Sequence, residues 1–383
     1  MFRLRRATGE QERRASFVEL FFDLVFVFFV TQLSAFLLAD LTVDGVGKTL
    51  LLLLIAWWAW LYTTWMTNWW DPDEIPIRIL LVFGMLASLL GGIAVPDAFG
   101  ERAMLFVVGY VGLQVTRNTF FVLGTDRSDP LFRPTARIAA WTGWVSLVWV
   151  AGALLGGDER IAVWVSALAL DYAGPYVGHW TPGLGRSTPR EWHLDHAHFT
   201  ERIALFMIIA LGESIVVTGA TASQFELTPA RVAALVVALL ITAALWWLYF
   251  DYHVRRLEGE LAAAGENRSR LGRDLGYLHV PLVAGIIVTA VANEIVIAGP
   301  GEELQRGELL ALGCGPALYL LGSVGFKLRA IHVFAWQRVA GAALVVAAAL
   351  LGTVASALAA WLLVLAALVA LVVFETLQRL TGA

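Results

Sequence analysis

The sequence predicts an all-α polytopic membrane protein with about twelve transmembrane helices. Its 383 residues are 59% hydrophobic and only 15% charged, with a mean hydropathy of +0.72. These values lie far from the composition of a soluble domain. Apolar runs of about 20 residues, the length needed to cross a bilayer, also recur along the whole chain. Together the observations exclude an ordinary soluble protein.

The expected spans follow from the apolar runs and from the polar residues that separate them. Their approximate bounds are 16–39, 47–67, 77–95, 102–123, 135–155, 160–179, 200–220, 230–250, 276–298, 307–327, 334–351 and 354–376. An even number of spans places both termini on one side of the membrane. All 27 Lys and Arg residues fall on that side except Lys48, Arg102, Arg160, Arg231 and Arg306. Because positively charged loops favour the cytoplasm, we expect both termini there.

We expect two six-helix halves joined by a cytoplasmic loop. The expected parts are an N-terminal arm at 1–15, a first half at 16–179, a loop at 180–199, a second half at 200–376 and a tail at 377–383. Trp60–Tyr62 at the end of the second span resembles Trp247–Tyr249 at the end of the eighth. Halves with an even number of spans share one orientation, so the repeat would be a parallel duplication. The mixed charges of 255–274 predict a short helix between two spans.

Two acids interrupt the first apolar run. Glu19 and Asp23 are one helical turn apart and share a face, and each carboxylate in hydrocarbon costs roughly 2.5–3.5 kcal/mol. At 1.5 Å per residue, Asp23 lies about 9 Å inside the cytoplasmic edge, level with Arg117 of the fourth span, so the two can pair. Glu19 lies nearer the headgroups, close to Arg202 and Lys327. A functional role and a structural ion pair are both open for these acids.

Further polar side chains are expected deep in other spans. Asp171 precedes Gly174-Pro175 in the sixth span, where a broken helix would offer backbone carbonyls to a substrate or ion. The alternative is a helix that ends one turn earlier. Glu213 in the seventh span and Asn293 with Glu294 in the ninth are expected at one depth. Two carboxylates at one level can share a proton or a cation, or form a structural hydrogen-bonded contact.

Histidines gather in the loop before the seventh span. His193, His196 and His198 have a spacing that can bind a metal ion, but no thiolate accompanies them, so we expect no metal site. The favoured interpretation is a cytoplasmic polar cluster formed by His198, Glu201, Arg202 and His279. The sequence contains no phosphate-binding glycine loop, nucleophile elbow or H-E-x-x-H motif. We therefore expect neither enzymatic chemistry nor a cofactor.

Two motifs together resemble the bacterial low temperature requirement A (LtrA) family. They are FVELFFDLVFV at 17–27, preceded by Arg13 and Arg14, and HFTERIALFMIIALGESIV at 198–216. The resemblance covers nearly the whole chain and implies a multi-pass protein of the bacterial inner membrane, but it names no substrate. The polar signature residues that it implies are Glu19, Asp23, His198, Glu201, Arg202, Gly212 and Glu213.

A looser resemblance links Arg13 and Phe17 to the opening of the lysosomal and bacterial potassium and proton channels with six-helix repeats. Val18-Glu19 stands here in place of the Ser-Asp of that motif, which argues against an equivalent pore. The resemblance keeps a channel among the alternatives.

These features favour a transporter of a small solute or ion that is proton-coupled through buried carboxylates. The candidate pathway residues are Glu19, Asp23, Arg117, Asp171, Glu213, Asn293 and Glu294. The alternatives are an ion channel built from the same residues and a non-transporting membrane protein that acts in cold or lipid adaptation. The expected partners are membrane lipids and the small solute or ion, and not nucleic acid. A homo-oligomer is compatible with the sequence.

Overall fold

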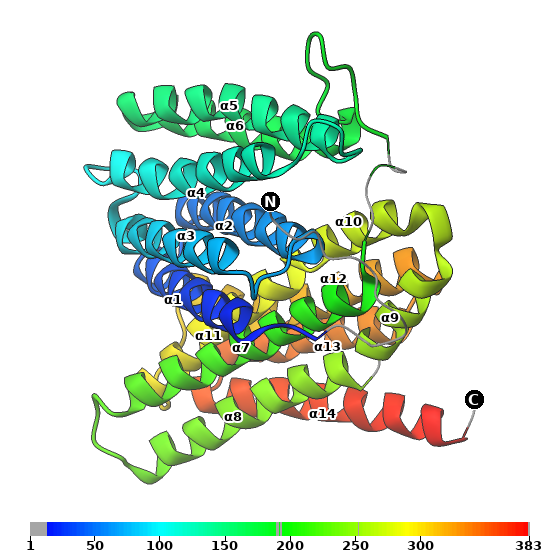
Figure 1. Ribbon diagram of the computed structural model, residues 1–383. Helices are drawn as coiled ribbons and strands as arrows, with labels where there is room; N and C mark the ends of the chain where they lie inside the picture. Colours follow the sequence, from blue (N-terminus) through cyan, green and yellow to red (C-terminus); the bar gives the residue numbers. More distant parts are fainter. Residues whose placement is uncertain (1–13, 189–190, 192–193, 252, 382–383) are drawn as a thin grey trace. The chain divides into compact units, whose positions relative to one another are not determined.

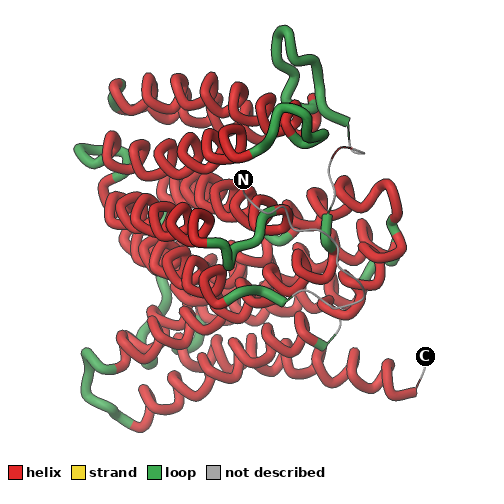
Figure 2. The backbone as a smooth tube through the Cα atoms, viewed as in Figure 1, coloured by secondary structure: helices red, strands yellow, loops and turns green. Residues whose placement is uncertain are grey.

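The computed structural model describes residues 14–188, 191, 194–251 and 253–381. The fold is all-α, and no strand occurs in this part of the chain (Figure 2). Among these described residues, eleven helices are long and apolar enough to cross a membrane. They correspond to eleven of the twelve spans expected from the sequence, so an all-α polytopic membrane protein is confirmed.

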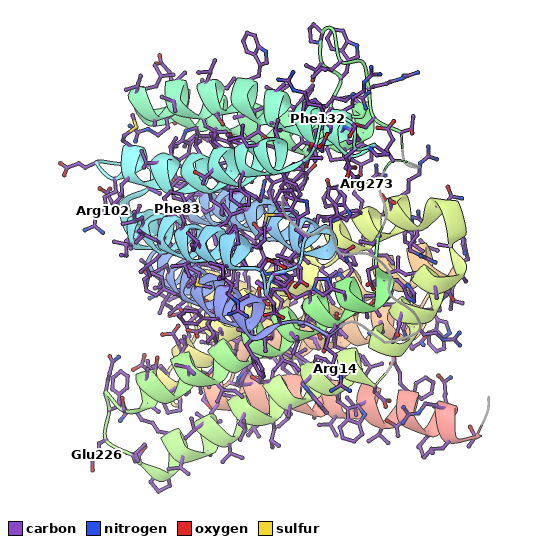
Figure 3. All side chains as sticks on the ribbon, in the orientation of Figure 1. Arg14, Phe83, Arg102, Phe132, Glu226 and Arg273 are labelled. Atoms are coloured by element: carbon purple, nitrogen blue, oxygen red, sulfur yellow. The ribbon has the colours of Figure 1, made fainter. Side chains whose placement is uncertain are left out.

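The helix bounds lie close to the expected spans (Figure 1). The helices are α1 (Phe17–Ala39), α2 (Val43–Trp69), α3 (Ile75–Ala94), α4 (Ala103–Gly124), α5 (Phe132–Leu154), α6 (Gly157–Val177), α7 (His196–Ala222), α8 (Pro229–Phe250), α9 (His253–Ala263), α10 (Arg268–Leu278), α11 (Val280–Ala298), α12 (Arg306–Ile331), α13 (Trp336–Leu350) and α14 (Ala357–Thr381). The segment 255–274 contains parts of two short helices, α9 and α10, where one was expected. Loops join the longer helices; Arg102 directly precedes α4, and Glu226 lies between α7 and α8 (Figure 3).

The exception among the expected spans is α6. It has the length of a span, but it carries Asp158, Glu159, Arg160 and Asp171 and is not among the eleven apolar helices. The expectation of an even number of spans therefore depends on this helix.

The expected break in α6 is not present. The helix continues through Pro175 to Val177 and ends at Gly178, whose φ of 66° is the left-handed conformation favoured at helix C-termini. Pro175 lies in the last turn, and the helix ends two residues beyond it. Pro175 has no N–H to donate to the Asp171 carbonyl, but the helix does not break there, so the broken-helix interpretation was wrong.

The chain forms two compact units. The first comprises residues 1–32, 51–202 and 264–272, and the second comprises 33–50, 203–263 and 273–383. These bounds do not coincide with the two expected halves, since 33–50 belongs to the second unit and 264–272, like the start of α7, to the first. The proposed duplication stays a prediction.

In the first unit, each helix from α3 to α6 packs on the next one along the chain (Figure 1). Gly109 of α4 lies against the backbone of α3, and a Cβ atom there would come within 2.6 Å of the Ala87 carbonyl oxygen and 2.8 Å of the Gly91 nitrogen. Small residues allow this close approach of helices, as is common in membranes. Buried Trp side chains fill much of the remaining interior, including Trp57, Trp60, Trp149 and Trp164.

In the second unit, α11 to α14 pack in the same successive way, and α8 packs on α14. Gly285 and Gly315 bring α11 and α12 together, since a Cβ atom on Gly285 would lie 2.8 Å from the Gly315 carbonyl oxygen. Close backbone contacts of this kind thus hold α3 on α4 in the first unit and α11 on α12 in the second.

Candidate functional site

The first unit contains a charge cluster, which we define by Glu19, Asp23, His198 and Arg202. Glu19 and Asp23 are four residues apart on α1, and His198 and Arg202 are four residues apart on α7, so each pair lies on one helix face. All four residues have 0% exposure. His198 and Arg202 were expected in a cytoplasmic polar cluster, but both are buried; His198 contacts Glu19, and Arg202 contacts both acids.

Arg202 binds both acids of the cluster. Its Nη1 lies 2.9 Å from Oε1 of Glu19, and its Nη2 lies 2.5 Å from Oδ1 of Asp23. The indole Nε1 of Trp60 also donates to Oδ1 of Asp23 at 2.8 Å. The expected pairing of Asp23 with Arg117 was therefore wrong, whereas the expected proximity of Glu19 to Arg202 is confirmed.

The hydrogen bonds around His198 favour its neutral form. The Asn68 side chain accepts from the Asp195 N–H and donates to the Asp195 carbonyl, each at 2.8 Å, which fixes the orientation of its amide group. Its Nδ2 lies 3.3 Å from Nδ1 of His198, so that ring nitrogen accepts a hydrogen bond. The other ring nitrogen, Nε2, then carries the proton and donates to Oε1 of Glu19 at 2.9 Å.

The charge cluster consequently holds two carboxylates and one guanidinium, a net charge of −1 when all three are ionised. Three of the four carboxylate oxygens are paired, because Oε2 of Glu19 also accepts from the Ser16 backbone and hydroxyl at 2.8 and 3.0 Å. Oδ2 of Asp23 is buried and has no hydrogen-bond partner among the described residues. A buried acceptor without a partner is costly and indicates a missing proton, water or ion.

A second polar chain runs through the same unit from Asp171 to Arg117. Oδ2 of Asp171 accepts from Tyr110 Oη at 2.7 Å and from Trp149 Nε1 at 2.9 Å. Gln114 donates to Tyr110 Oη at 3.2 Å and accepts from Arg117. Two neutral side chains thus bridge the Asp171 carboxylate and the Arg117 guanidinium.

Arg117 is surrounded by neutral acceptors. In addition to Gln114, it donates to Asn118 Oδ1, to the Ala59 carbonyl and to Thr63 Oγ1 at 3.1–3.3 Å. Thr63 belongs to α2, which also carries Trp60 and Asn68, two side chains that contact the charge cluster. Polar residues of α2 therefore contact both buried systems.

The second unit holds the remaining pathway residues. Asn293 has 0% exposure; its Oδ1 accepts from Trp361 Nε1 at 3.0 Å and its Nδ2 donates to Ser214 Oγ at 3.3 Å. Glu294 accepts from Thr221 Oγ1 at 2.9 Å. Glu213 is 8% exposed. Asn293 thereby joins α7, α11 and α14, and a proton or cation shared between Glu213 and Glu294 stays a prediction.

The other residues of the expected polar cluster have separate partners. Glu201 accepts from the Ala15 backbone N–H at 2.6 Å. His279, in the second unit, contacts Tyr249 Oη through Nε2 and the Leu275 carbonyl through Nδ1, at 2.9 and 2.7 Å. Within the second unit, Lys327 lies 3.7 Å from Glu375, and its expected proximity to Glu19 stays a prediction.

Of the three loop histidines, His193 lies outside the described residues. In the part of the chain that the structure describes, no three His, Cys, Asp or Glu side chains are grouped to hold a metal ion.

Sequence reasoning did not identify Trp60, Asn68, Gln114 and Trp149 as partners of the buried charges. Trp is common at the membrane interface, so its place in the sequence does not reveal a buried hydrogen-bond donor. Gln114 and Asn118 gave a usable signal, since they are polar residues close to Arg117 within an apolar run.

A comparison with known proteins agrees with the two motifs. Residues 14–373 match the family model of the bacterial low temperature requirement A protein (LtrA). The chain is also similar to the uncharacterized protein RA0937 of Rhizobium meliloti (strain 1021), with 35% identity over 344 residues that cover 89% of this chain and 84% of the relative. The charge cluster on α1 and α7 thus lies within the matched region, and the chain belongs to the LtrA family.

Proposed function

We propose that the protein is a proton-coupled transporter of a small solute or ion in the bacterial inner membrane, with both termini in the cytoplasm. The observation that carries the proposal is the net charge of −1 in the buried charge cluster, together with the unpartnered Oδ2 of Asp23. Charged groups inside membrane spans are rare and usually mark ion or proton pathways.

The cluster is suited to a proton and not to a metal cation. A hard cation takes about six oxygen ligands, or more, at short distance. Three of the four carboxylate oxygens of Glu19 and Asp23 already accept hydrogen bonds from donors, so only Oδ2 of Asp23 remains. One proton on that oxygen neutralises the cluster without any other ligand.

Protonation of Asp23 would alter the contact between α1 and α7. A neutral carboxyl group attracts the Arg202 guanidinium much less than a carboxylate does, whereas Glu19 keeps its ion pair. The proton therefore weakens one of the two links of Arg202 to α1. The attraction between Asp23 and Arg202 thus differs between the protonated and the ionised state. Such a difference is what a proton-driven switch between two conformations requires.

Asp171 is a second place for a proton in the first unit. It is 4% exposed and accepts from two neutral donors, Tyr110 and Trp149. Among the described residues it forms no ion pair, so its charge is compensated only through the bridge to Arg117. We assign Asp171 to the same proton-handling system.

The test measures proton movement in vesicles that contain the full chain. A potassium diffusion potential drives protons inward, and a trapped pH-sensitive dye reports them. We expect proton uptake above that of empty vesicles, and a loss of at least about tenfold in Asp23→Asn. The matched control is Asp44→Asn, which removes an exposed acid from a surface ion pair with Lys48 and should leave the flux unchanged.

Equal flux in the wild type and in Asp23→Asn, or no flux above empty vesicles, would show the proposal to be wrong. Unitary currents in planar bilayers would assign the same residues to a channel.

The second candidate is a non-transporting membrane protein of cold or lipid adaptation, which is favoured by the complete burial of the acids and by the small volume of the cavity in the same unit. The charge cluster is fully buried, and the cavity between α1, α2, α3 and α4 measures about 20 Å³, with a lining dominated by apolar side chains such as Phe26, Phe29 and Phe106. That volume is about enough for one water molecule. For this function, Asp23→Asn should alter thermal stability while no proton flux is found.

A further inference from the structure

The second unit contains a different ionic cluster, which we define by Lys327, Arg338 and Glu375. Arg338 binds the Glu375 carboxylate with two nitrogens, Nε to Oε1 at 2.8 Å and Nη2 to Oε2 at 2.7 Å. Nη2 also donates to the Leu248 carbonyl at 3.0 Å. The Lys327 ammonium lies 3.7 Å from Oε1 of the same carboxylate. Two cations in this cluster therefore share one anion.

Arg338 has hydrogen-bonding capacity that the described residues do not use. Its side chain has 0% exposure, and Nη1 is buried without a hydrogen-bond partner among them. Leaving a buried donor of a charged group unsatisfied destabilises the folded state. The unsatisfied guanidinium donor, which lies beside a second cation, indicates that an anion belongs in this place.

The surroundings place the cluster at the level of lipid headgroups. Arg338 lies in the first turn of α13, and Lys327 and Glu375 lie near the C-terminal ends of α12 and α14. Trp336 and Phe374 are 61% and 41% exposed and contact each other, with ring centroids 6.4 Å apart. Exposed Trp and other aromatic side chains next to helix ends are typical of the membrane–water interface.

We propose that Arg338 and Lys327 form a binding site for a phosphate group, supplied by an anionic lipid headgroup or by free phosphate. A guanidinium matches the geometry of phosphate oxygens, and a lysine adds a compact point charge. Glu375 occupies the same cations in the absence of the ligand, so the bound phosphate competes with this carboxylate. Basic sites between helix ends are a known way of holding lipid headgroups.

The test is thermal unfolding of the detergent-solubilised full chain with added phosphatidylglycerol, phosphatidylcholine or inorganic phosphate. Phosphatidylglycerol should raise the Tm by on the order of 2–4 °C more than phosphatidylcholine does. An equal rise with inorganic phosphate would support the site and assign free phosphate as its source. No rise with either phosphatidylglycerol or phosphate would overturn the proposal.

Two variants separate a phosphate site from a purely structural ion pair. Lys327→Gln should reduce the ligand-induced rise, whereas Arg329→Gln should not, because Arg329 lies two residues further on α12 and binds Asp274. Equal losses in the two variants would contradict the proposal.

Glu375→Gln should lower the Tm without ligand but increase the ligand-induced rise, because the competing carboxylate is gone. A purely structural ion pair predicts the lower Tm without any larger rise, and that result would also contradict the site.

Discussion

Arg202 is the residue on which the charge cluster depends. It compensates two fully buried carboxylates, and no other ionised cation of the described chain lies within ion-pair distance of them, since the hydrogen bonds of His198 favour its neutral form. Loss of one acid and loss of the arginine therefore have different effects on the net charge of the cluster. Removing one acid brings the net charge of the cluster to zero, whereas removing Arg202 leaves two negative charges in a low-dielectric interior.

This asymmetry predicts the stabilities of single variants. Arg202→Met should lower the free energy of unfolding by about 3–5 kcal/mol, the usual cost of leaving a buried charge uncompensated. Asp23→Asn should cost much less, because the Glu19–Arg202 pair that remains is neutral. The measurement is thermal or chemical unfolding of the purified variants in detergent.

Combining Asp23→Asn with Arg202→Met provides the control for that comparison. The double variant keeps a single buried acid, so it should be more stable than Arg202→Met alone. A double variant less stable than Arg202→Met would mean that packing of the Arg202 side chain, and not its charge, dominates.

At the scale of helices, close contacts between α3 and α4 hold the first unit in the register that its buried polar groups need. The Gly109 contact with α3 lies next to Tyr110, which donates to Asp171. A side chain at position 109 would push the two helices apart and move the Tyr110 hydroxyl away from its partner.

Gly109→Val should therefore destabilise the protein by about 1–3 kcal/mol, the usual cost of overpacking. Gly112 on the same helix is the matched control, because a Cβ atom there meets nothing within 4 Å. Gly112→Ala should be neutral or slightly stabilising, since Ala favours helix over Gly. Comparable losses in both variants, measured by thermal unfolding, would contradict the close-contact argument.

The helices themselves could be predicted from local sequence, but most partners of the buried charges could not. Apolar runs gave spans at 102–123 and 230–250, and the structure has α4 and α8 within about one residue of those bounds. Spacing also placed Glu19 and Asp23 on one face. The depth of a residue along its helix does not determine which neighbouring helix its side chain faces, however. Asp23 and Arg117 were expected at equal depth, yet Arg117 donates to Gln114, Asn118 and residues of α2, because the rotation of each helix is set by tertiary contacts.

At the scale of the whole molecule, the number of membrane crossings depends on α6. Average hydropathy counts its charged residues as if they faced lipid, but in the structure two of them form hydrogen bonds within the protein. Arg160 donates to the carbonyls of Phe99, Gly100 and Leu155, and Asp171 accepts from Tyr110 and Trp149. Paired polar groups that face the protein interior are tolerated in membrane helices. We therefore expect α6 to cross the membrane as the twelfth span.

Cysteine labelling tests this expectation on the intact protein. In a Cys314→Ala background, which removes the chain's single cysteine, Gly156→Cys precedes α6 and Gly183→Cys follows it. If α6 crosses the membrane, a membrane-impermeant thiol reagent should reach these two positions from opposite sides of oriented vesicles.

Ser128→Cys, before α5, should label from the same side as Gly183→Cys, because α5 and α6 pack against each other as an antiparallel pair of spans. Labelling of positions 156 and 183 from one side would leave eleven spans and place the termini on opposite sides of the membrane. With twelve spans, all but five of the 27 Lys and Arg residues fall on the side of both termini; this is the bias expected of cytoplasmic loops, so it argues for the first outcome.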